Sequence, residues 1–525
     1  MSTTRAVWLF LLVLTAIRLT LVGTTDLSFD EAHYWMWSER LAPAYFSKGP
    51  GVAFAIWSSA SVFGANEFGV RFWSPVLAAG TSLLLYYFAR RLFSDLTGFW
   101  VVVAANVTPI FNIGAFVMTI DPLSIFFWTA AMFTFWLALE RAPEFSWHWP
   151  LTGFLIGLGF LCKYTNALEL ISVVIVLALV PRFRREFMRP GFYLLLGAFA
   201  ICTLPPIVWN AQHAWATLGH LRSRGSLDEA VGFNPLELLE FLAVHFAVYS
   251  PILFLGIAWA VIAGWRRSQQ QFKGVFLVWF GLPVFAFYFI LSINRAANPN
   301  WDGLAFLSLA VLAASFWRER AESRPTISRW AAIGLVLGLL MSALALNSDL
   351  LRTAGVTLPR RDPADRMRGW RSGAEGVEKV RADVEAQIGE RVFVIADERD
   401  RASELAFYFR DRRVEGAGHP PVYIVESQDI LNQFSFWPRY DEFVAAPANA
   451  TREEGDVYTE EDGVNPFAGR SAIYVQANAK PDLPRNISAA FASTDLFATV
   501  EVRRFGKILR TFRVFLCRNY RTLPL

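Results

Sequence analysis

The chain has 525 residues, of which 54% are hydrophobic and only 18% charged, and its formal net charge is +4. A soluble domain needs about a quarter of its residues charged, so this composition excludes a soluble protein and indicates a polytopic membrane protein. The arginines lie in short clusters between apolar segments and form no basic stripe with interleaved aromatics, which excludes a nucleic-acid-binding surface.

Apolar windows along the chain predict about eleven membrane-spanning helices. The first window could be a signal peptide, but no A-x-A-like cleavage site follows it, so we expect a retained helix. The segment 51–68 is apolar but short, and we expect it to lie at the membrane interface. The spans are predicted at 6–24, 71–89, 98–117, 121–139, 150–162, 167–180, 191–209, 240–263, 274–292, 301–317 and 329–347.

Basic residues are unevenly divided between the connections of these predicted spans. If the N-terminus is cytoplasmic, the cytoplasmic connections hold Arg90, Arg91, Arg141 and the basic runs at 181–190, 265–273 and 317–329. The positive-inside rule then places the first loop and everything after the last span outside, which is the periplasmic face if the membrane is a bacterial inner membrane.

The composition changes near residue 350. Strand-like runs such as "RVFVIAD", "PPVYIVE" and "SAIYVQA" alternate there with helix-like runs, and "ATVEVRRFGKILRTFRVFLCRNY" is typical of a hairpin. We therefore predict two domains: a transmembrane α-helical domain, residues 1–349, and a soluble periplasmic α/β domain, residues 350–525.

The loop after the first predicted helix, residues 29–51, is rich in reactive side chains. It combines Asp30, Glu31, His33 and Lys48 with many aromatic rings. One interpretation is an amphipathic interfacial helix whose charges face water. The other is a membrane-surface active site, with a carboxylate as general base and a lysine that receives an anionic group.

Two further charged residues are predicted on the same side of the membrane. Asp121, in "TIDPLSIFF", begins an apolar helix, and Lys163, in "FLCKYT", follows another. An intramembrane carboxylate favours a functional interpretation, although Asp before Pro is also an ordinary N-cap. Lys163 alone would be interpreted as a snorkelling lysine, but together these charges suggest one convergent site.

These residues carry a resemblance to a known family. An acidic pair after the first helix, a "YF-x-K" element, an interfacial helix and an Asp at the start of the fourth helix resemble GT-C polyprenyl-phosphate-sugar-dependent glycosyltransferases. The most similar groups are the family-39-like and aminoarabinose-transferase-like enzymes, which are related to protein O-mannosyltransferases. Their resemblance implies a GT-C fold with interfacial helices in the first outer loop.

The resemblance also implies roles for matching positions. Asp30 corresponds to the family's catalytic base, Glu31 to a supporting carboxylate, and Asp121 to the second acidic position. Lys48 and Lys163 correspond to the lysines near the lipid phosphate. Further substrate-binding candidates come from the quoted loop, from "GANEFGVRFWSPVLA" and "NPNWDGLAF", and from nearby basic positions: Tyr45, His33, Arg71, Arg222, Arg295 and Trp301.

No metal site is predicted. Many relatives have an acidic residue before the loop lysine and two prolines after it, whereas this chain has Ser47-Lys48-Gly49-Pro50-Gly51. The histidines show no helix-face spacing typical of metal ligands. No cofactor is therefore assigned, although a divalent metal stays open.

The predicted function is an inverting glycosyl transfer. A sugar on a polyprenyl phosphate has an anionic leaving group that needs positive charge more than a proton, so one base and one or more cations suffice. The predicted partners are the polyprenyl-phosphate sugar, the membrane lipid, and a lipid, glycan or protein acceptor such as lipid A. One alternative is a lipid-glycan ligase or polymerase, which the long loop at 210–236 favours. The other is a secondary transporter, but the sequence shows no inverted repeat that would support it.

Overall fold

The computed structural model describes residues 2–224, 232–295, 297–353, 355, 362–441, 465–477 and 483–525. Within these ranges the chain forms two compact units. The first comprises residues 1–23 and 42–364, and the second comprises residues 24–41 and 365–525. The C-terminal unit thus also takes in the whole of α2, Phe29–Ser38, which the sequence analysis had placed in a loop of the membrane domain.

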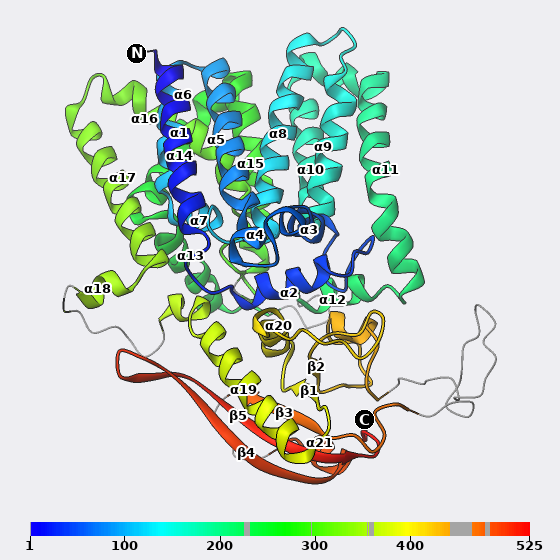
Figure 1. Ribbon diagram of the computed structural model, residues 1–525. Helices are drawn as coiled ribbons and strands as arrows, with labels where there is room; N and C mark the ends of the chain where they lie inside the picture. Colours follow the sequence, from blue (N-terminus) through cyan, green and yellow to red (C-terminus); the bar gives the residue numbers. More distant parts are fainter. Residues whose placement is uncertain are drawn as a thin grey trace. The chain divides into compact units, whose positions relative to one another are not determined.

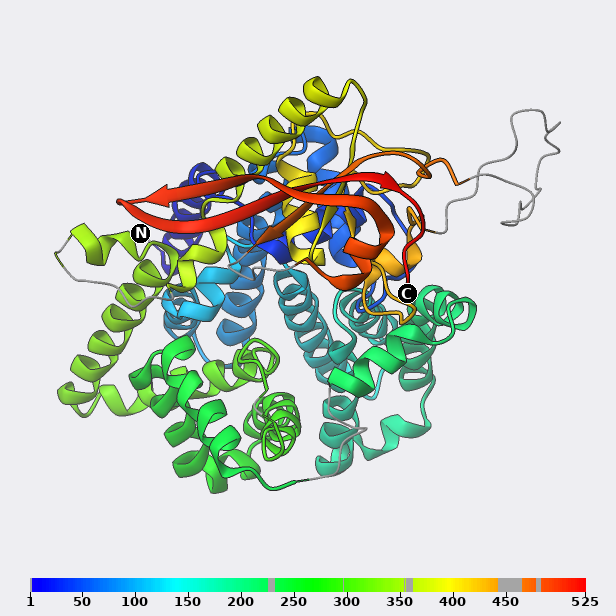
Figure 2. The ribbon, with the colours of Figure 1, turned by 90° about the horizontal axis from the view of Figure 1, so that it is seen from below.

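The first unit is helical, and its long helices run side by side in Figure 1 and are seen nearly end-on in Figure 2. Its helices are α1 (Thr3–Leu21), α3 (Gly51–Phe63), α4 (Glu67–Arg71), α5 (Trp73–Leu92), α6 (Asp95–Val107), α7 (Pro109–Gly114), α8 (Ile120–Arg141), α9 (His148–Cys162), η1 (Tyr164–Ala167), α10 (Leu168–Leu179), η2 (Pro181–Met188), α11 (Pro190–Gln212), α12 (Ala216–Arg224), α13 (Pro235–Tyr249), α14 (Pro251–Gln270), α15 (Phe272–Leu291), α16 (Ala305–Ala321), α17 (Pro325–Leu346) and α18 (Asp349–Thr353).

Six of the described helical segments are long and apolar enough to cross a membrane, or up to eight if each of two bent pairs counts as one span. The helices 51–63, 95–107 and 148–162 are apolar but shorter. This confirms a polytopic helical protein, while the predicted count of about eleven spans stays a prediction.

Two of the predicted spans are interrupted, which corrects the sequence-based expectation. The segment 240–263 is divided between α13 and α14, which meet at 112°. Ser250 has a φ of 67° there, and Pro251 cannot donate the backbone hydrogen bond that would continue the first helix. The segment 98–117 is divided between α6 and α7 at Thr108, whose extended conformation is the one favoured before a proline.

The second unit is an α/β domain around one five-stranded sheet with strand order β2-β1-β3-β5-β4. The first three of these strands are parallel, and β5 is antiparallel to both of its neighbours. Its elements are α2, η3 (Pro363–Met367), α19 (Trp370–Ile388), β1 (Phe393–Ala396), α20 (Arg399–Tyr408), β2 (Tyr423–Ile424), η4 (Gln433–Phe436), β3 (Ala472–Ala477), α21 (Arg485–Ala490), β4 (Phe491–Arg504) and β5 (Lys507–Tyr520).

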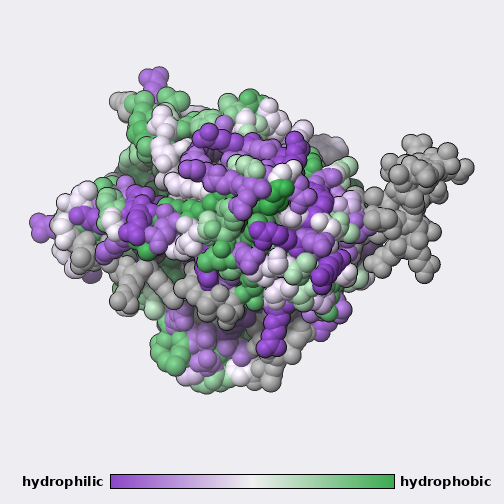
Figure 3. All heavy atoms as spheres, turned by 60° about the horizontal axis from the view of Figure 1, so that its bottom comes forward, coloured by the Kyte–Doolittle hydropathy of each residue, from purple (hydrophilic) through white to green (hydrophobic). Residues whose placement is uncertain are grey.

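The predicted hairpin is confirmed, with Arg504 paired to Lys507 across the turn. The helix α19 packs on this hairpin at Gly373, where an added Cβ would lie 2.3 Å from the ring of Phe512. The surface seen in Figure 3 carries many hydrophilic residues, as expected where a protein meets water.

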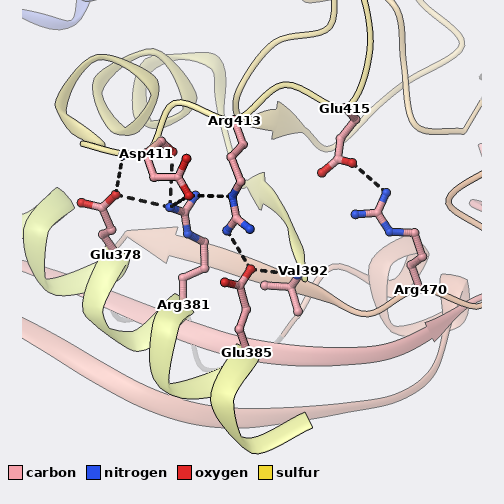
Figure 4. A network of polar contacts seen from close by, with 8 residues as sticks. All are labelled: Glu378, Arg381, Glu385, Val392, Asp411, Arg413, Glu415 and Arg470. Atoms are coloured by element: carbon pink, nitrogen blue, oxygen red, sulfur yellow. Dashed lines mark hydrogen bonds and ion pairs between the residues drawn. The ribbon is translucent and has the colours of Figure 1, made fainter. Parts of the chain in front are cut away.

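Ion pairs join α19 to the segment that follows α20 (Figure 4). Arg381 of α19 lies 3.4 Å from Asp411, and Glu385 of α19 lies 2.7 Å from Arg413. Arg381 is also 3.3 Å from Glu378, one turn earlier on its own helix. These charged residues therefore have a structural role: their partly buried ion pairs hold α19 against the segment after α20.

Candidate active site

Asp121 lies in the first turn of α8, beside the helix N-terminus. The N-cap is Thr119, whose Oγ1 accepts a hydrogen bond of 3.2 Å from the backbone N–H of Asp121. The alternative in which Asp121 itself caps the helix is therefore wrong. The carboxylate of Asp121 is left to interact with other segments, and its side chain is only 19% exposed.

Lys163 comes directly after α9 in an extended conformation, which turns the chain away from the helix axis. Its Nζ donates to Asp121 Oδ1 at 2.9 Å and to the carbonyl oxygen of Asn300 at 3.1 Å. The lysine side chain is 8% exposed. Its stem is thus covered, and its ammonium group forms a charge-assisted pair in place of snorkelling to water.

Asn300 completes this cluster from the segment between α15 and α16. Its Nδ2 donates to Asp121 Oδ2 at 2.8 Å. Each carboxylate oxygen of Asp121 therefore has its own donor, and Asn300 contacts both members of the ion pair. The cluster of Asp121, Lys163 and Asn300 joins three segments that are far apart in the sequence.

Asp302, two residues further on, anchors the same segment to α13. His245 Nδ1 lies 2.6 Å from the carbonyl oxygen of Phe241, and His245 Nε2 lies 2.7 Å from Asp302 Oδ2. A carbonyl oxygen only accepts hydrogen bonds, so Nδ1 carries a proton, and one further proton lies between Nε2 and Oδ2. Both side chains are fully buried, and the pair is neutral overall wherever that second proton resides.

Lys48 is brought to the same end of α9 as Lys163 by two glycines. A Cβ at Gly49 would lie 2.1 Å from the carbonyl oxygen of Leu161, and one at Gly51 would lie 2.4 Å from Cys162 Sγ. Only glycine allows this close approach of the loop to the helix end. The departure from the family pattern around Lys48 therefore has a packing reason, while the contact of Lys48 with a phosphate stays a prediction.

The other predicted binding residues of this unit have varied surroundings. Tyr45 is buried, and its hydroxyl accepts from the backbone N–H of Ala42 at 3.2 Å. Arg71 is buried and donates to the carbonyl oxygen of Val22 at 2.9 Å, which ties α4 to the end of α1. These two contacts are structural, and a substrate contact of either residue stays a prediction.

The remaining three predicted residues lie at or near the Asn300 segment and α12. Arg222 and Arg295 are exposed. Trp301 is half-buried, and the guanidinium of Arg224 lies 5.6 Å from its ring centroid. Trp301 directly follows Asn300 in the sequence. Its ring forms a cation–π contact with Arg224.

Asp30, Glu31 and His33 belong to α2 in the second unit. Glu31 forms a capping box with Ser28: its Oε2 accepts from the backbone N–H of Ser28 at 2.9 Å, and the side chain is fully buried. Asp30, next to it in the first helical turn, is half-buried. The structure gives Glu31 a helix-capping role, and the catalytic roles of both carboxylates stay predictions.

His33 is held by a directed chain of hydrogen bonds. Trp37 Nε1 donates to His33 Nε2 at 3.2 Å, and Ser403 Oγ lies 3.0 Å from His33 Nδ1 and donates to the carbonyl oxygen of Arg399. The hydroxyl proton of Ser403 is thus engaged, so Nδ1 is the donor and His33 is the neutral tautomer. Both ring nitrogens have protein partners, which gives His33 a structural role, and a substrate contact of His33 stays a prediction.

The chain is similar to sugar transferases that use lipid-linked donors. A family model described as dolichyl-phosphate-mannose-protein mannosyltransferase matches residues 47–209. Lipid A galacturonosyltransferase RgtD of Rhizobium johnstonii is 27% identical over 433 residues, covering 81% of this chain and 85% of that protein. The undecaprenyl phosphate-alpha-4-amino-4-deoxy-L-arabinose arabinosyl transferase of Edwardsiella ictaluri is 29% identical over 299 residues, covering 53% of this chain and 51% of that protein.

The fold agrees with these relatives. The crystal structure of ArnT from Cupriavidus metallidurans in the apo state matches with a TM-score of 0.61 at 14% identity, covering 98% of both chains. The same protein bound to undecaprenyl phosphate matches with a TM-score of 0.60 at 16% identity, again over 98% of both chains. The chain is a glycosyltransferase that shares the fold of ArnT.

The comparisons do not favour the two alternatives raised from the sequence, a lipid-glycan ligase or polymerase and a secondary transporter. In this glycosyltransferase the sequence analysis missed Asn300 and the pair of His245 with Asp302. The motif "NPNWDGLAF" contains Asn300 and Asp302 and was singled out only for Trp301. The signal that could have found them is that the polar residues Asn300 and Asp302 stand on either side of Trp301, which was itself a predicted binding residue.

Among the residues that the structure describes, no group of three or more His, Cys, Asp or Glu could hold a metal ion. His245 has both ring nitrogens engaged by Phe241 and Asp302.

Acidification from pH 7 to pH 5 should destabilise the unit that holds His33. Burial, and then the charge of Arg399, lower the pKa of His33 to about 3, whereas an exposed histidine has a pKa near 6.5. Below pH 6.5 the unfolded chain binds a proton that folded His33 does not, so stability falls with pH, by about 2 kcal/mol at pH 5. Melting temperatures of the wild type and His33→Gln measure this effect. The variant should be less stable at pH 7 but lose less on acidification, and parallel pH curves would contradict it.

Proposed function

We propose that this chain transfers a sugar from a polyprenyl-phosphate-linked donor to an acceptor hydroxyl, with an envelope glycolipid of the lipid A class as the acceptor. The observation that carries the proposal is the buried pair of Lys163 and Asp121 at the start of α8. It is supported by relatives whose names state a lipid A acceptor and an undecaprenyl phosphate donor.

The donor phosphate is the proposed ligand of the two lysines at the end of α9. A departing polyprenyl phosphate needs positive charge, and a cation that is already fixed in place costs no reorganisation when the phosphate leaves. Lys163 is fixed by Asp121 and Asn300, and Lys48 is carried to the same helix end by Gly49. Arg224 and Arg222 of α12 are proposed as further cations near this phosphate.

Asp30 is the proposed general base. It takes the proton of the acceptor hydroxyl while that oxygen forms a bond to the anomeric carbon, and the bond from this carbon to the phosphate oxygen breaks. The electron pair leaves with the phosphate, and attack from the opposite face inverts the anomeric centre. Asp121 is less suited to be the base, because both of its oxygens already accept hydrogen bonds. We assign it the role of orienting Lys163.

We propose that this reaction takes place at the periplasmic face of a bacterial inner membrane. Arg90 and Arg91 lie at the end of α5 and Arg141 at the end of α8, whereas Asp121 lies at the beginning of α8. The positive-inside rule places the arginine ends in the cytoplasm and the opposite ends outside. The C-terminal unit, residues 350–525 in the sequence-based division, is proposed to lie outside as well.

The experiment uses membrane vesicles that contain the chain, with a synthetic polyprenyl-phosphate sugar and purified lipid A added to the medium. We expect sugar transfer, detected as a mass increase of lipid A, in right-side-out vesicles. Inside-out vesicles prepared from the same cells are the control and should transfer little until they are permeabilised. Transfer only to protein would reject the glycolipid acceptor, and efficient transfer only in sealed inside-out vesicles would reject the orientation.

A further inference from the structure

A cavity of about 930 Å³ lies at the opposite ends of the helices from the candidate active site. Glu140, in the last turn of α8, lines it, whereas Asp121 lies in the first turn of the same helix. At a rise of about 1.5 Å per residue, the two positions are about 30 Å apart, which equals the thickness of a bilayer core. The cavity therefore lies near the other membrane surface.

The carboxylates that line this cavity are already paired with arginines. Glu140 lies 2.6 Å from Arg91, and Glu319 lies 2.7 Å from Arg267. Glu186 lies 3.5 Å from Arg189. These three arginines thus compensate the negative charge of the carboxylates that line the cavity.

Three further cations line the cavity: Arg182, Arg185 and Lys273. In the part of the chain that the structure describes, none of them has a carboxylate within ion-pair distance. The guanidinium of Arg182 lies against an edge-to-face pair of rings, 4.5 Å from the centroid of Phe183 and 4.6 Å from that of Phe272. Arg182 is exposed, so its cation is held at these rings and its N–H groups can still reach a phosphate.

We propose that this cavity binds the phosphate headgroup of an anionic phospholipid in the leaflet opposite the candidate active site. Phosphate oxygens match the fork of an arginine, and the three cations without a carboxylate partner match the negative charge, although Lys273 also donates to the carbonyl oxygen of Leu92. The rings of Phe183 and Phe272 offer an apolar wall to the glycerol and upper acyl chains. The positive-inside rule alone explains basic residues at this end, but it requires neither a cavity nor a guanidinium held against a pair of rings.

The test measures lipid binding to the purified full-length protein by native mass spectrometry. Phosphatidylglycerol should bind, phosphatidylcholine should bind much more weakly, and inorganic phosphate should compete poorly because it lacks the acyl chains. Arg182→Ala and Arg185→Ala should each weaken phosphatidylglycerol binding about tenfold or more, the usual loss for a hydrogen bond to a charged group. Arg185 is exposed, so its variant keeps the proposal testable if Arg182→Ala does not fold.

Arg184→Ala is the matched control. Arg184 is an exposed arginine of the same η2 segment, but it does not line the cavity and donates to the carbonyl oxygen of Ala178 at 2.8 Å. This variant should bind phosphatidylglycerol as the wild type does. An equal loss in Arg184→Ala would indicate unspecific surface charge and overturn the proposal. Unchanged binding in both cavity variants, or inorganic phosphate binding as tightly as the lipid, would also overturn it.

Discussion

Asp30→Asn should reduce sugar transfer to a hydroxyl acceptor by about 10²–10⁴-fold, the loss typical of removing a general base. The substitution keeps the size of the side chain and removes its basicity. Purified protein assayed with a synthetic polyprenyl-phosphate sugar gives kcat and KM separately, and the loss should fall on kcat. The affinity for the donor should change little, because the phosphate is assigned to other residues.

Glu31→Gln is the matched control for this variant. Glu31 is adjacent in the sequence and is buried, and its carboxylate accepts from the backbone of Ser28 in a capping box. A glutamine can still accept that hydrogen bond, so the helix start should survive and activity should stay close to the wild type. Full activity of Asp30→Asn would contradict the assignment of the base, and a large loss in Glu31→Gln would move that role to Glu31.

Lys163→Met should lower kcat/KM for the donor by a factor that corresponds to about 2–5 kcal/mol of lost transition-state stabilisation. This is the range measured when one partner of a buried charge pair is truncated. The methionine retains the apolar stem but removes the ammonium group, so the carboxylate of Asp121 keeps only the donor from Asn300. Binding of a labelled polyprenyl phosphate and steady-state kinetics measure the two parts of the loss. Lys379→Met, at an exposed lysine of α19, is the control and should be silent.

A double-mutant cycle with Asp121→Asn separates charge pairing from donor binding. In Lys163→Met the carboxylate of Asp121 is left without its ammonium partner. If this uncompensated charge destabilises the variant, the double variant should melt at a higher temperature than Lys163→Met alone. Donor binding should not recover, because the cation is still missing. Recovery of both properties would contradict a phosphate-binding role, and additive losses in melting temperature would contradict the pairing.

Much of the architecture follows from local patterns. The hairpin of β4 and β5 and the strands β1 and β3 lie where the strand-like runs predicted them, since these patterns depend on neighbouring residues. The interruptions at Thr108 and Ser250 were missed although a proline follows each residue. An apolar window averages over about 19 residues, so it does not register a single break in the backbone.

The sequence by itself determined that this is a polytopic membrane protein with a C-terminal α/β unit, because composition and periodicity record how a chain divides between lipid and water. It also singled out Asp121 and Lys163 as costly charges beside apolar helices. Only the tertiary structure decided that these two residues pair, that Asn300 joins them, and that Asp302 anchors the joining segment to His245. Such contacts connect segments up to 179 residues apart, and no local pattern encodes which distant groups helix packing will bring within hydrogen-bond distance.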